Sequence, residues 1–313
     1  MRINKLKIGK ITLKNRLFLA PMLDITNLPY RLICRKSGCA MAYTEMINVP
    51  AIIHENEKTK NMMKTCKEDS PLGIQITGNN VQEFKKIIPY LKKYDIVDIN
   101  CGCPSEKIYS NESGSYLLNN PEKIAEIIKL LKREGLTVTA KIRLGFKKNN
   151  VLEVAKLIEK AGADAITVHA RLASEGYDTP ADLNWIKKIK KELTIPVIGN
   201  GDVINEEKAV EMLKICDGAM IARGAIGDPL IFERILYYLK TGKKKDFSFK
   251  DNIKCFEGYL ELCERYKVIN IPIIKHLGTK FIKNINGASK LRFELMKCKD
   301  FPAIINFFKK MNN

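Results

Sequence analysis

The sequence lacks any apolar stretch long enough to cross a membrane. No apolar run among its 313 residues approaches the roughly 18 residues that a membrane-spanning helix needs. Residues 1–7 contain no continuous apolar segment of the kind found in secretory signals. We therefore expect a cytoplasmic protein that has no membrane partner.

Paired cysteines with metal-ligand spacing are also missing. The chain has nine cysteines, but Cys34-x4-Cys39 and Cys101-x-Cys103 do not match the C-x2-C pairs of structural zinc sites. In a chain of this size and class, nine cysteines fit reduced thiols better than a disulfide framework. We predict no metal site.

A third absence concerns the fold. No glycine-rich dinucleotide fingerprint follows the first strand, and a doubly wound open sheet would usually carry one. Eight apolar segments alternate with segments of helical periodicity over about 240 residues, which favours an α/β (β/α)8 TIM barrel. The predicted strands are Leu17–Ala20, Met41–Glu45, Leu72–Thr77, Ile96–Asn100, Thr137–Arg143, Ala165–His169, Pro196–Asn200 and Gly218–Ala222.

The segments between the strands predict helices at Thr26–Ser37, Val81–Lys92, Pro121–Glu134, Val151–Ala161, Leu183–Glu192, Glu206–Ile215 and Asp228–Leu239. The connection around Ile52–Lys64 is less clear. Residues 6–13 alternate around Gly9 and predict a small hairpin before the first strand.

Positive charge is concentrated near the C-terminus. The net charge is +19, and residues 240–313 hold 17 basic and 7 acidic side chains, a net of +10. This excess favours a polyanionic partner, although general basicity of a lysine-rich proteome is the alternative. Lys243-Lys244-Lys245 marks the boundary between a barrel of residues 1–242 and a small helical domain of residues 243–313.

The helices predicted in this second domain are Asp251–Tyr266, Ile273–Asn284, Lys290–Met296 and Pro302–Met311. Aromatic residues lie among its basic ones, and at helical spacing they are more often core than base-stacking platforms. They are Phe256, Tyr259, Tyr266, Phe281 and Phe293.

The segment Asp98-Ile99-Asn100-Cys101-Gly102-Cys103-Pro104-Ser105 has the strongest chemical signal. A buried strand stops there, because Pro104 cannot continue a β-ladder and Gly102 permits a tight turn. Cys103 therefore lies where a strand ends and a loop begins, which is where barrels place their chemistry. Its thiol could serve as an acid or a nucleophile, and the alternative is an inert buried cysteine.

Polar residues recur at the carboxyl ends of the predicted strands and would line one cavity. They are Glu45, Gln75, Asn100, Lys141 with Arg143, His169, Asn200 and, after the last strand, Arg223. Glycine-containing turns follow the last two strands, at residues 199–202 and 223–228. In barrels such turns often hold a phosphate.

These motifs resemble the tRNA-dihydrouridine synthases. The resembling stretches are residues 20–26, 42–46, 98–104, 141–145, 167–171, 176–177, 180–182, 200–202 and 220–224, followed by 275–277 and 286–288 in the tail. They span the barrel in the order of that family. The sequence departs from the usual pattern at Ala170, Leu172 and Ala173 and in the polar segment 109–113.

The resemblance implies an FMN-binding barrel followed by a helical tRNA-binding domain. It implies reduction of specific uridines in tRNA to 5,6-dihydrouridine, with NADPH as electron donor. By position, Cys103 would be the general acid, and Asn100, Arg143 and Tyr177 would face the uracil. The implied flavin-binding residues are Pro21, Met22, Leu23, Gln75, Lys141, His169, Asn200, Gly201, Asp202, Ala222 and Arg223.

Two other functions remain open from the sequence. One is a flavin barrel that acts on a small metabolite such as dihydroorotate, which would not need residues 243–313 or their charge. The other is a non-catalytic RNA-binding module, which would leave the polar strand ends unexplained. We expect a monomer, and no protein partner is implied. The sequence does not identify the modified tRNA position, nor does it separate NADPH from NADH.

Overall fold

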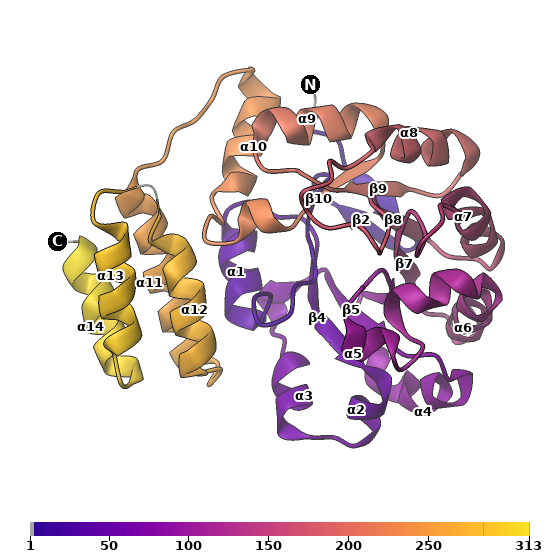
Figure 1. The fold of residues 1–313 in the computed structure, drawn as a ribbon, viewed down its shortest axis with the longest axis horizontal. Helices are drawn as coiled ribbons and strands as arrows, with labels where there is room; N and C mark the ends of the chain where they lie inside the picture. The colour runs from indigo at the N-terminus through magenta and orange to yellow at the C-terminus, as the bar shows by residue number, and fades with distance from the viewer. Residues whose placement is uncertain (1–2, 284, 313) are drawn as a thin grey trace.

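The chain forms a ring of eight parallel strands surrounded by helices, with four further helices at one side (Figure 1). A computed structural model describes residues 3–283 and 285–312. The strands follow one another in chain order around the sheet, and a parallel bridge joins Phe18 of β3 to Met41, the residue before β4. The strands are β3 (Leu17–Leu19), β4 (Ala42–Asn48), β5 (Leu72–Thr77), β6 (Ile96–Cys101), β7 (Val138–Arg143), β8 (Ala165–His169), β9 (Val197–Asn200) and β10 (Gly218–Ile221). The predicted TIM barrel is confirmed.

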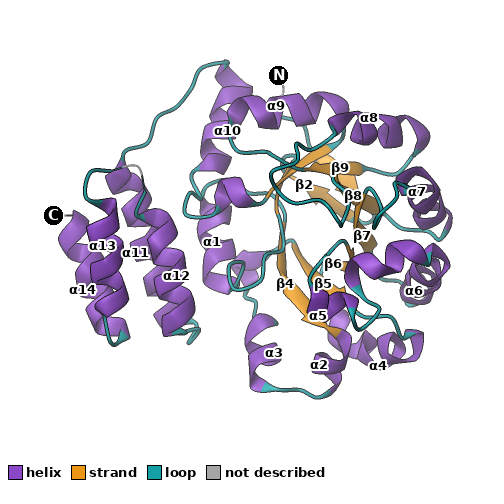
Figure 2. Ribbon diagram, in the orientation of Figure 1, coloured by secondary structure: helices purple, strands orange, loops and turns teal. Residues whose placement is uncertain are grey.

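Helices form the outer layer, as Figure 2 shows. Each main helix has an apolar side that packs on the sheet, which is why its sequence has helical periodicity. They are α1 (Leu28–Lys36), α4 (Val81–Leu91), α6 (Pro121–Arg133), α7 (Val151–Lys160), α8 (Leu183–Glu192), α9 (Glu206–Ile215) and α10 (Ile231–Thr241). The unclear connection after β4 contains two short helices, α2 (Val49–Ile53) and α3 (Glu57–Met62), and the loop after β6 contains α5 (Glu106–Tyr109).

The predicted hairpin closes the amino end of the barrel. Its strands β1 (Leu6–Ile8) and β2 (Ile11–Leu13) pair around Gly9, which has a φ of +53°. Ile8 and Leu13 are buried in one cluster with the side chains that fill the barrel, including Phe18 and Met220. The hairpin therefore packs against the side chains that fill this end of the barrel.

The tail is a four-helix unit with an aromatic core. It consists of α11 (Phe249–Arg265), α12 (Ile271–Phe281), α13 (Ala288–Lys297) and α14 (Phe301–Asn312). The ring of Phe256 lies 4.8 Å from that of Phe281 and 4.4 Å from that of Phe308. Residue 284, the predicted end of one of these helices, lies outside the described residues. Most predicted core aromatics are buried, but Phe293 is 61% exposed and is not part of the core.

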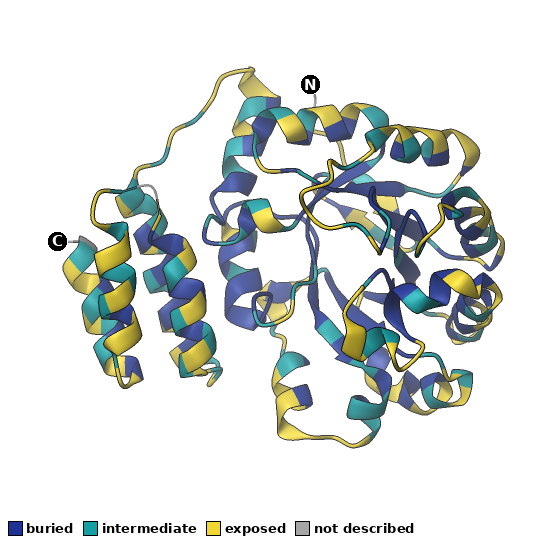
Figure 3. Ribbon diagram, in the orientation of Figure 1, coloured by how far each residue is buried: buried dark blue, intermediate teal, exposed yellow. Residues whose placement is uncertain are grey.

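The tail packs on α1 of the barrel. A long exposed connection leaves α10, and α11 then returns to lie beside α1 (Figures 1 and 3). Tyr259 of α11 accepts a 3.0 Å hydrogen bond from Asn27, the residue that caps α1. Its ring also contacts that of Tyr30, edge to face. Barrel and tail therefore share one continuous apolar core.

A buried ion-pair network ties α1 to the segment before β5, and it generates a stability prediction. Arg31 and Asp69 are completely buried and 2.7 Å apart, and Arg35 binds the same carboxylate at 2.9 Å. Asp69→Ala would leave both guanidinium groups without their carboxylate, so we expect the unfolding free energy to fall by about 3–5 kcal/mol. Urea unfolding followed by circular dichroism measures this.

The matched control is Glu57→Ala, which removes the carboxylate of the exposed pair Lys60–Glu57. Exposed pairs contribute little, so its urea midpoint should match that of the unmodified chain. Equal midpoints for Asp69→Ala and Glu57→Ala would contradict the assigned role of the network.

Candidate active site

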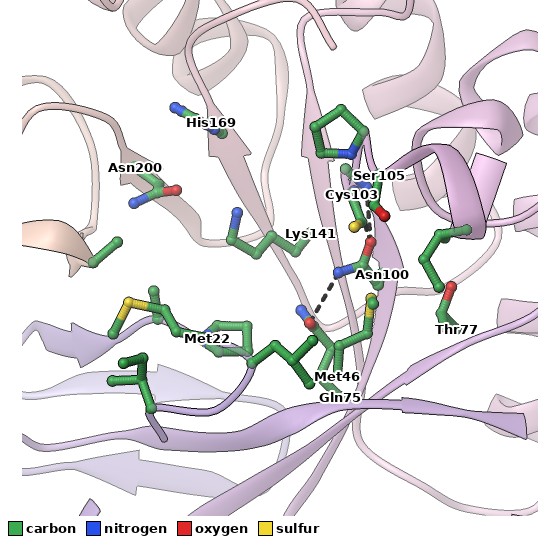
Figure 4. A pocket seen from close by; sticks show the side chains of 18 of the residues that line it. Met22, Met46, Gln75, Thr77, Asn100, Cys103, Ser105, Lys141, His169 and Asn200 are labelled. Atoms are coloured by element: carbon green, nitrogen blue, oxygen red, sulfur yellow. Dashed lines mark hydrogen bonds between the residues drawn. The ribbon is translucent and has the colours of Figure 1, made fainter. Parts of the chain in front are cut away.

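A cavity of about 750 Å³ opens at the carboxyl ends of the barrel strands. Figure 4 shows it from close by, with side chains from most of the strands pointing into it. All fifteen residues that the family resemblance assigns to the site line this cavity. They are Pro21, Met22, Leu23, Gln75, Asn100, Cys103, Lys141, Arg143, His169, Tyr177, Asn200, Gly201, Asp202, Ala222 and Arg223.

The loop that carries Cys103 is held by hydrogen bonds at the end of β6. The amide oxygen of Asn100 accepts the backbone N–H groups of Gly102, at 3.1 Å, and Cys103, at 2.9 Å. The carbonyl of Cys103 accepts the N–H of Ser115 at 3.0 Å. The loop therefore presents the half-buried Cys103 thiol to the cavity in a fixed conformation.

Cys101 has a different environment. It is completely buried in the apolar core and does not line the cavity. Burial raises the pKa of its thiol far above the usual range, so it stays protonated and inaccessible. Of the two neighbouring cysteines, only Cys103 can touch a molecule in the cavity.

Two cations from β7 enter the cavity. Lys141 extends into its middle, between His169 and Asn200 on one side and Asn100 on the other (Figure 4). Desolvation and the neighbouring Arg143 lower the pKa of Lys141 to about 8. In residues 3–283 and 285–312 its ammonium group has no hydrogen-bond or ion-pair partner.

Arg143 is held more firmly than Lys141. Its guanidinium donates to the carbonyl oxygens of Gly102, at 2.8 Å, and Leu172, at 2.9 Å. Arg143 thus joins the Cys103 loop to the loop after β8, and it brings a positive charge close to the thiol.

His169 is a neutral imidazole in this site. Desolvation and the surrounding cations Lys141, Arg143, Arg171 and Arg223 lower its pKa to about 2. Arg171 Nη1 lies 3.2 Å from His169 Nε2, and because arginine can only donate, Nε2 is the acceptor. The remaining ring proton is therefore on Nδ1, which can donate a hydrogen bond to a bound molecule.

The loops after β9 and β10 meet at a network of charged residues. The Asp202 carboxylate accepts hydrogen bonds from Arg171 at 2.7 Å and from Arg223 at 2.9 Å. The guanidinium of Arg223 lies 4.2 Å above the ring of Tyr177, which is 56% exposed at the rim. Asp202 thus orients both arginines. Sequence reasoning did not assign Arg171 to the site, although it lies in the matched stretch 167–171.

The prediction that Glu45 lines the cavity is wrong. It is buried outside the cavity, and its carboxylate accepts the backbone N–H of Asp24 at 2.7 Å. The pairing of β4 with β5 shifts register between Tyr43 and Met46, and β4 continues to Asn48. The shift moves the cavity-facing positions along the strand, so that Met46 and Asn48 line the cavity instead.

The donor set fits a flavin. Pro21, Met22 and Leu23 form an apolar strip that suits a flat ring system, and Gln75, Lys141 and His169 supply polar groups for a ring edge. The hydroxyl of Thr77 also lines the cavity, and it is buried without a hydrogen-bond partner, so a bound molecule could satisfy it. Arg223 suits a phosphate.

Metal-binding clusters and membrane-spanning helices are absent from the described part of the chain. Residues 3–283 and 285–312 contain no group of three or more histidine, cysteine, aspartate or glutamate side chains that could hold a metal ion. The same residues include no helix that is long and apolar enough to cross a membrane.

Solved structures share the fold at low sequence identity. A variant of NCR from Zymomonas mobilis superposes with a TM-score of 0.54 at 12% identity, covering 80% of this chain and 94% of that one. A chain of the Amycolatopsis orientalis BexX/CysO complex superposes with a TM-score of 0.51 at 14% identity, covering 78% and 98%.

Relatives found by sequence have a much higher identity to this chain than these structures do. A tRNA-dihydrouridine synthase B of Pseudomonas aeruginosa is 36% identical over 322 residues, covering 98% of this chain and 97% of the relative. Another, of Pasteurella multocida, is 38% identical over 234 residues, covering 72% and 70%. The model of the dihydrouridine synthase family matches residues 18–308, and this chain therefore belongs to that family.

Proposed function

We propose that this chain reduces specific uridines in tRNA to 5,6-dihydrouridine, using FMN bound in the barrel and NADPH as electron donor. The observation that carries the proposal is the Cys103 thiol, which enters a cavity whose other walls carry a flavin-compatible donor set. When bound, FMN would supply the hydride for C6 of the uracil ring.

Separate groups of cavity residues would bind the separate parts of the cofactor. Pro21, Met22 and Leu23 would lie along the flavin ring, and Gln75 and Lys141 would bind its polar edge, with His169 nearby. Asn200, Gly201, Asp202, Ala222 and Arg223 would hold the ribityl chain and phosphate. In this assignment Asp202 acts through the two arginines whose guanidinium groups it binds.

Cys103 would hold the proton that C5 receives at its Sγ. Asn100, Arg143 and Tyr177 would face the uracil, and the positive charge of Arg143 would stabilise negative charge that develops on the pyrimidine carbonyl. A uridine within folded tRNA would have to leave its stack to enter a cavity this deep in the barrel mouth.

The tail would bind the tRNA, so that residues 1–242 form the catalytic domain and 243–313 the tRNA-binding domain. The net charge of +10 over residues 240–313 supports this role. The exposed side of α13 adds an aromatic ring to the charge, because Phe293 lies there with Lys297 above its ring at 4.2 Å. A flavin barrel for a small metabolite would have no use for this surface.

FMN retention should depend on the charge of Lys141. The ammonium group loses its proton as the pH rises through about 8, so we expect the Kd for FMN to increase by roughly tenfold between pH 7 and pH 9. In this range His169, with a pKa of about 2, does not titrate. Lys141→Met should bind FMN weakly and with a flat pH profile.

Flavin fluorescence titration from pH 6.5 to 9.5 measures this dependence. Lys132→Met is the matched control, because Lys132 pairs with Asp164 far from the cavity and does not line it. A protein that binds no FMN at any pH would overturn the assignment of the cavity to a flavin.

Cys101, the last residue of β6, and Cys103, in the loop that follows, should differ in their effect on one half-reaction. Cys103→Ala should still bind FMN and be reduced by NADPH, because that step needs no proton at C5. Reoxidation by unmodified tRNA should slow by about 10²–10⁴, the usual contribution of a positioned general acid.

Cys101→Ala is the control, since its thiol is buried outside the cavity. Rapid mixing of reduced enzyme with tRNA distinguishes the two variants. If Cys101→Ala is slow and Cys103→Ala is normal, the wrong cysteine has been assigned. If both reoxidise normally, neither thiol donates the proton.

The tail can be tested without deleting it, which matters because α11 shares a core with α1. Lys290 and Lys297 lie on the exposed side of α13, and Lys290→Glu/Lys297→Glu should weaken tRNA binding. The slope of log K against log salt should fall by about 2 if each lysine neutralises one phosphate. Filter binding at several salt concentrations measures both effects.

The control makes the same change elsewhere, at the exposed residues Lys187 and Lys191 of α8. Lys187→Glu/Lys191→Glu should retain the tRNA affinity and salt slope of the unmodified chain. Equal losses in the two double variants would mean that only the overall charge matters.

A further inference from the structure

A buried carboxylate lies below the cavity and has no assigned role. Asp98, in the middle of β6, is 1% exposed. It accepts hydrogen bonds from Gln75 Nε2 on β5, at 2.7 Å, and from Thr139 Oγ1 on β7, at 2.6 Å. Both partners are paired with Asp98 in the sheet, so the contacts follow from strand register.

A chain of hydrogen bonds leads from this carboxylate to the Cys103 loop. Gln75 Oε1 accepts from Asn100 Nδ2 at 2.9 Å, and Asn100 Oδ1 accepts the backbone N–H groups of Gly102 and Cys103. Figure 4 shows the links at Asn100. Two amide side chains therefore connect Asp98 to the loop that carries the thiol.

In each hydrogen bond between Asp98 and the Cys103 loop, the donor and the acceptor are determined. An ionised carboxylate can only accept, so the Gln75 nitrogen must face Asp98 and its oxygen must face Asn100. Asn100 must then turn its nitrogen to Gln75 and its oxygen to the loop. The backbone N–H groups of the loop can only donate, so they require the same orientation of Asn100 from the other end.

We propose that Asp98 is a positioning residue, whose carboxylate orients Gln75 and Asn100 and thereby holds the Cys103 loop in place for proton donation. The proposal rests on the proposed function only in naming Cys103 as the donor. The orientation also leaves the second N–H of Gln75, which lines the cavity, free for a ligand.

Stability alone does not account for a carboxylate at this position. Burial is the main cause that raises the pKa of Asp98, to about 6, so the ionised form is disfavoured by its surroundings. Asparagine would avoid that cost, but its Nδ2 can only donate, so the Thr139 hydroxyl would have to accept instead of donating, or Gln75 would lose its acceptor. The carboxylate is the group of this size that accepts from both strands.

The test exchanges the carboxylate and the amide between positions 98 and 75, which are paired on neighbouring strands. Asp98→Asn replaces one acceptor oxygen by a donor, so that either the Thr139 hydroxyl must accept or Gln75 loses its acceptor, and Gln75→Glu places two carboxylates in contact. Each single variant should therefore disturb the hydrogen bonds that lead to the Cys103 loop. In Gln75→Glu/Asp98→Asn, the carboxylate introduced at position 75 can accept from Asn100 and from the amide introduced at position 98. The oxygen of that amide can still accept from Thr139. In the double variant, every hydrogen bond from Thr139 to the Cys103 loop therefore has a donor and an acceptor again.

Hydrogen exchange at the amides of Gly102 and Cys103, measured by mass spectrometry on the full-length chain with and without added FMN, reports the loop itself. We expect exchange there to be about tenfold faster in each single variant and to return toward the original rate in the double variant. Asp164→Asn is the control, because Asp164 also binds a strand N–H, that of Val138, but outside the cavity. It should leave both amides unchanged.

Unchanged exchange in both single variants, or a double variant that is no better protected than the worse single one, would overturn the proposal. A single variant that fails to fold while the double variant folds would support it. Failure is separable from failure of the proposed function, since exchange at these amides needs neither flavin nor tRNA, whereas FMN binding and tRNA-dependent reoxidation are measured independently.

Discussion

The site depends on the pairing of parallel strands in one register. Parallel strands end at the same edge of a sheet, and alternate side chains point into the barrel. Pairing places Asn100 beside Lys141, and it sets His169 between Arg143 and Asn200. Strand side chains that are far apart in the sequence, such as Met46 and Asn200, thereby meet in one cavity.

This regularity explains what could be predicted from the sequence. All eight strands, the main helices and the polar cavity-lining residues at the ends of six strands, β5 to β10, follow from periodicity and from polar residues at strand ends. Glu45 failed because a register shift within β4 has no signature in a single sequence. The role of Asp202 also needed coordinates, since an aspartate in a glycine-rich turn gives no sign that two distant arginines bind it. The order of the motifs that this chain shares with its family did not depend on either feature.

Two of the cations that line the cavity lower the stability of the folded chain. Lys141 and Arg143 bring positive charge into a partly desolvated space, and desolvation lowers the pKa of both. Among the described residues no carboxylate pairs with either, because Asp202 binds Arg171 and Arg223 and Asp98 binds Gln75 and Thr139. A ligand that brings negative charge or acceptors into this space would stabilise the fold as well as occupy the site.

The contact between Asn27 and Tyr259 has a consequence for how the two parts of the chain can vary. The oxygen of Asn27 caps α1 by accepting the N–H of Tyr30, and its nitrogen donates to Tyr259 of the tail. The same short segment continues back into residues 21–23 of the cavity wall. A tail taken from a relative would therefore carry its own requirement for the residues at positions 27 and 30. Chimaeras that exchange tails should be designed with α1 as part of the transplanted piece.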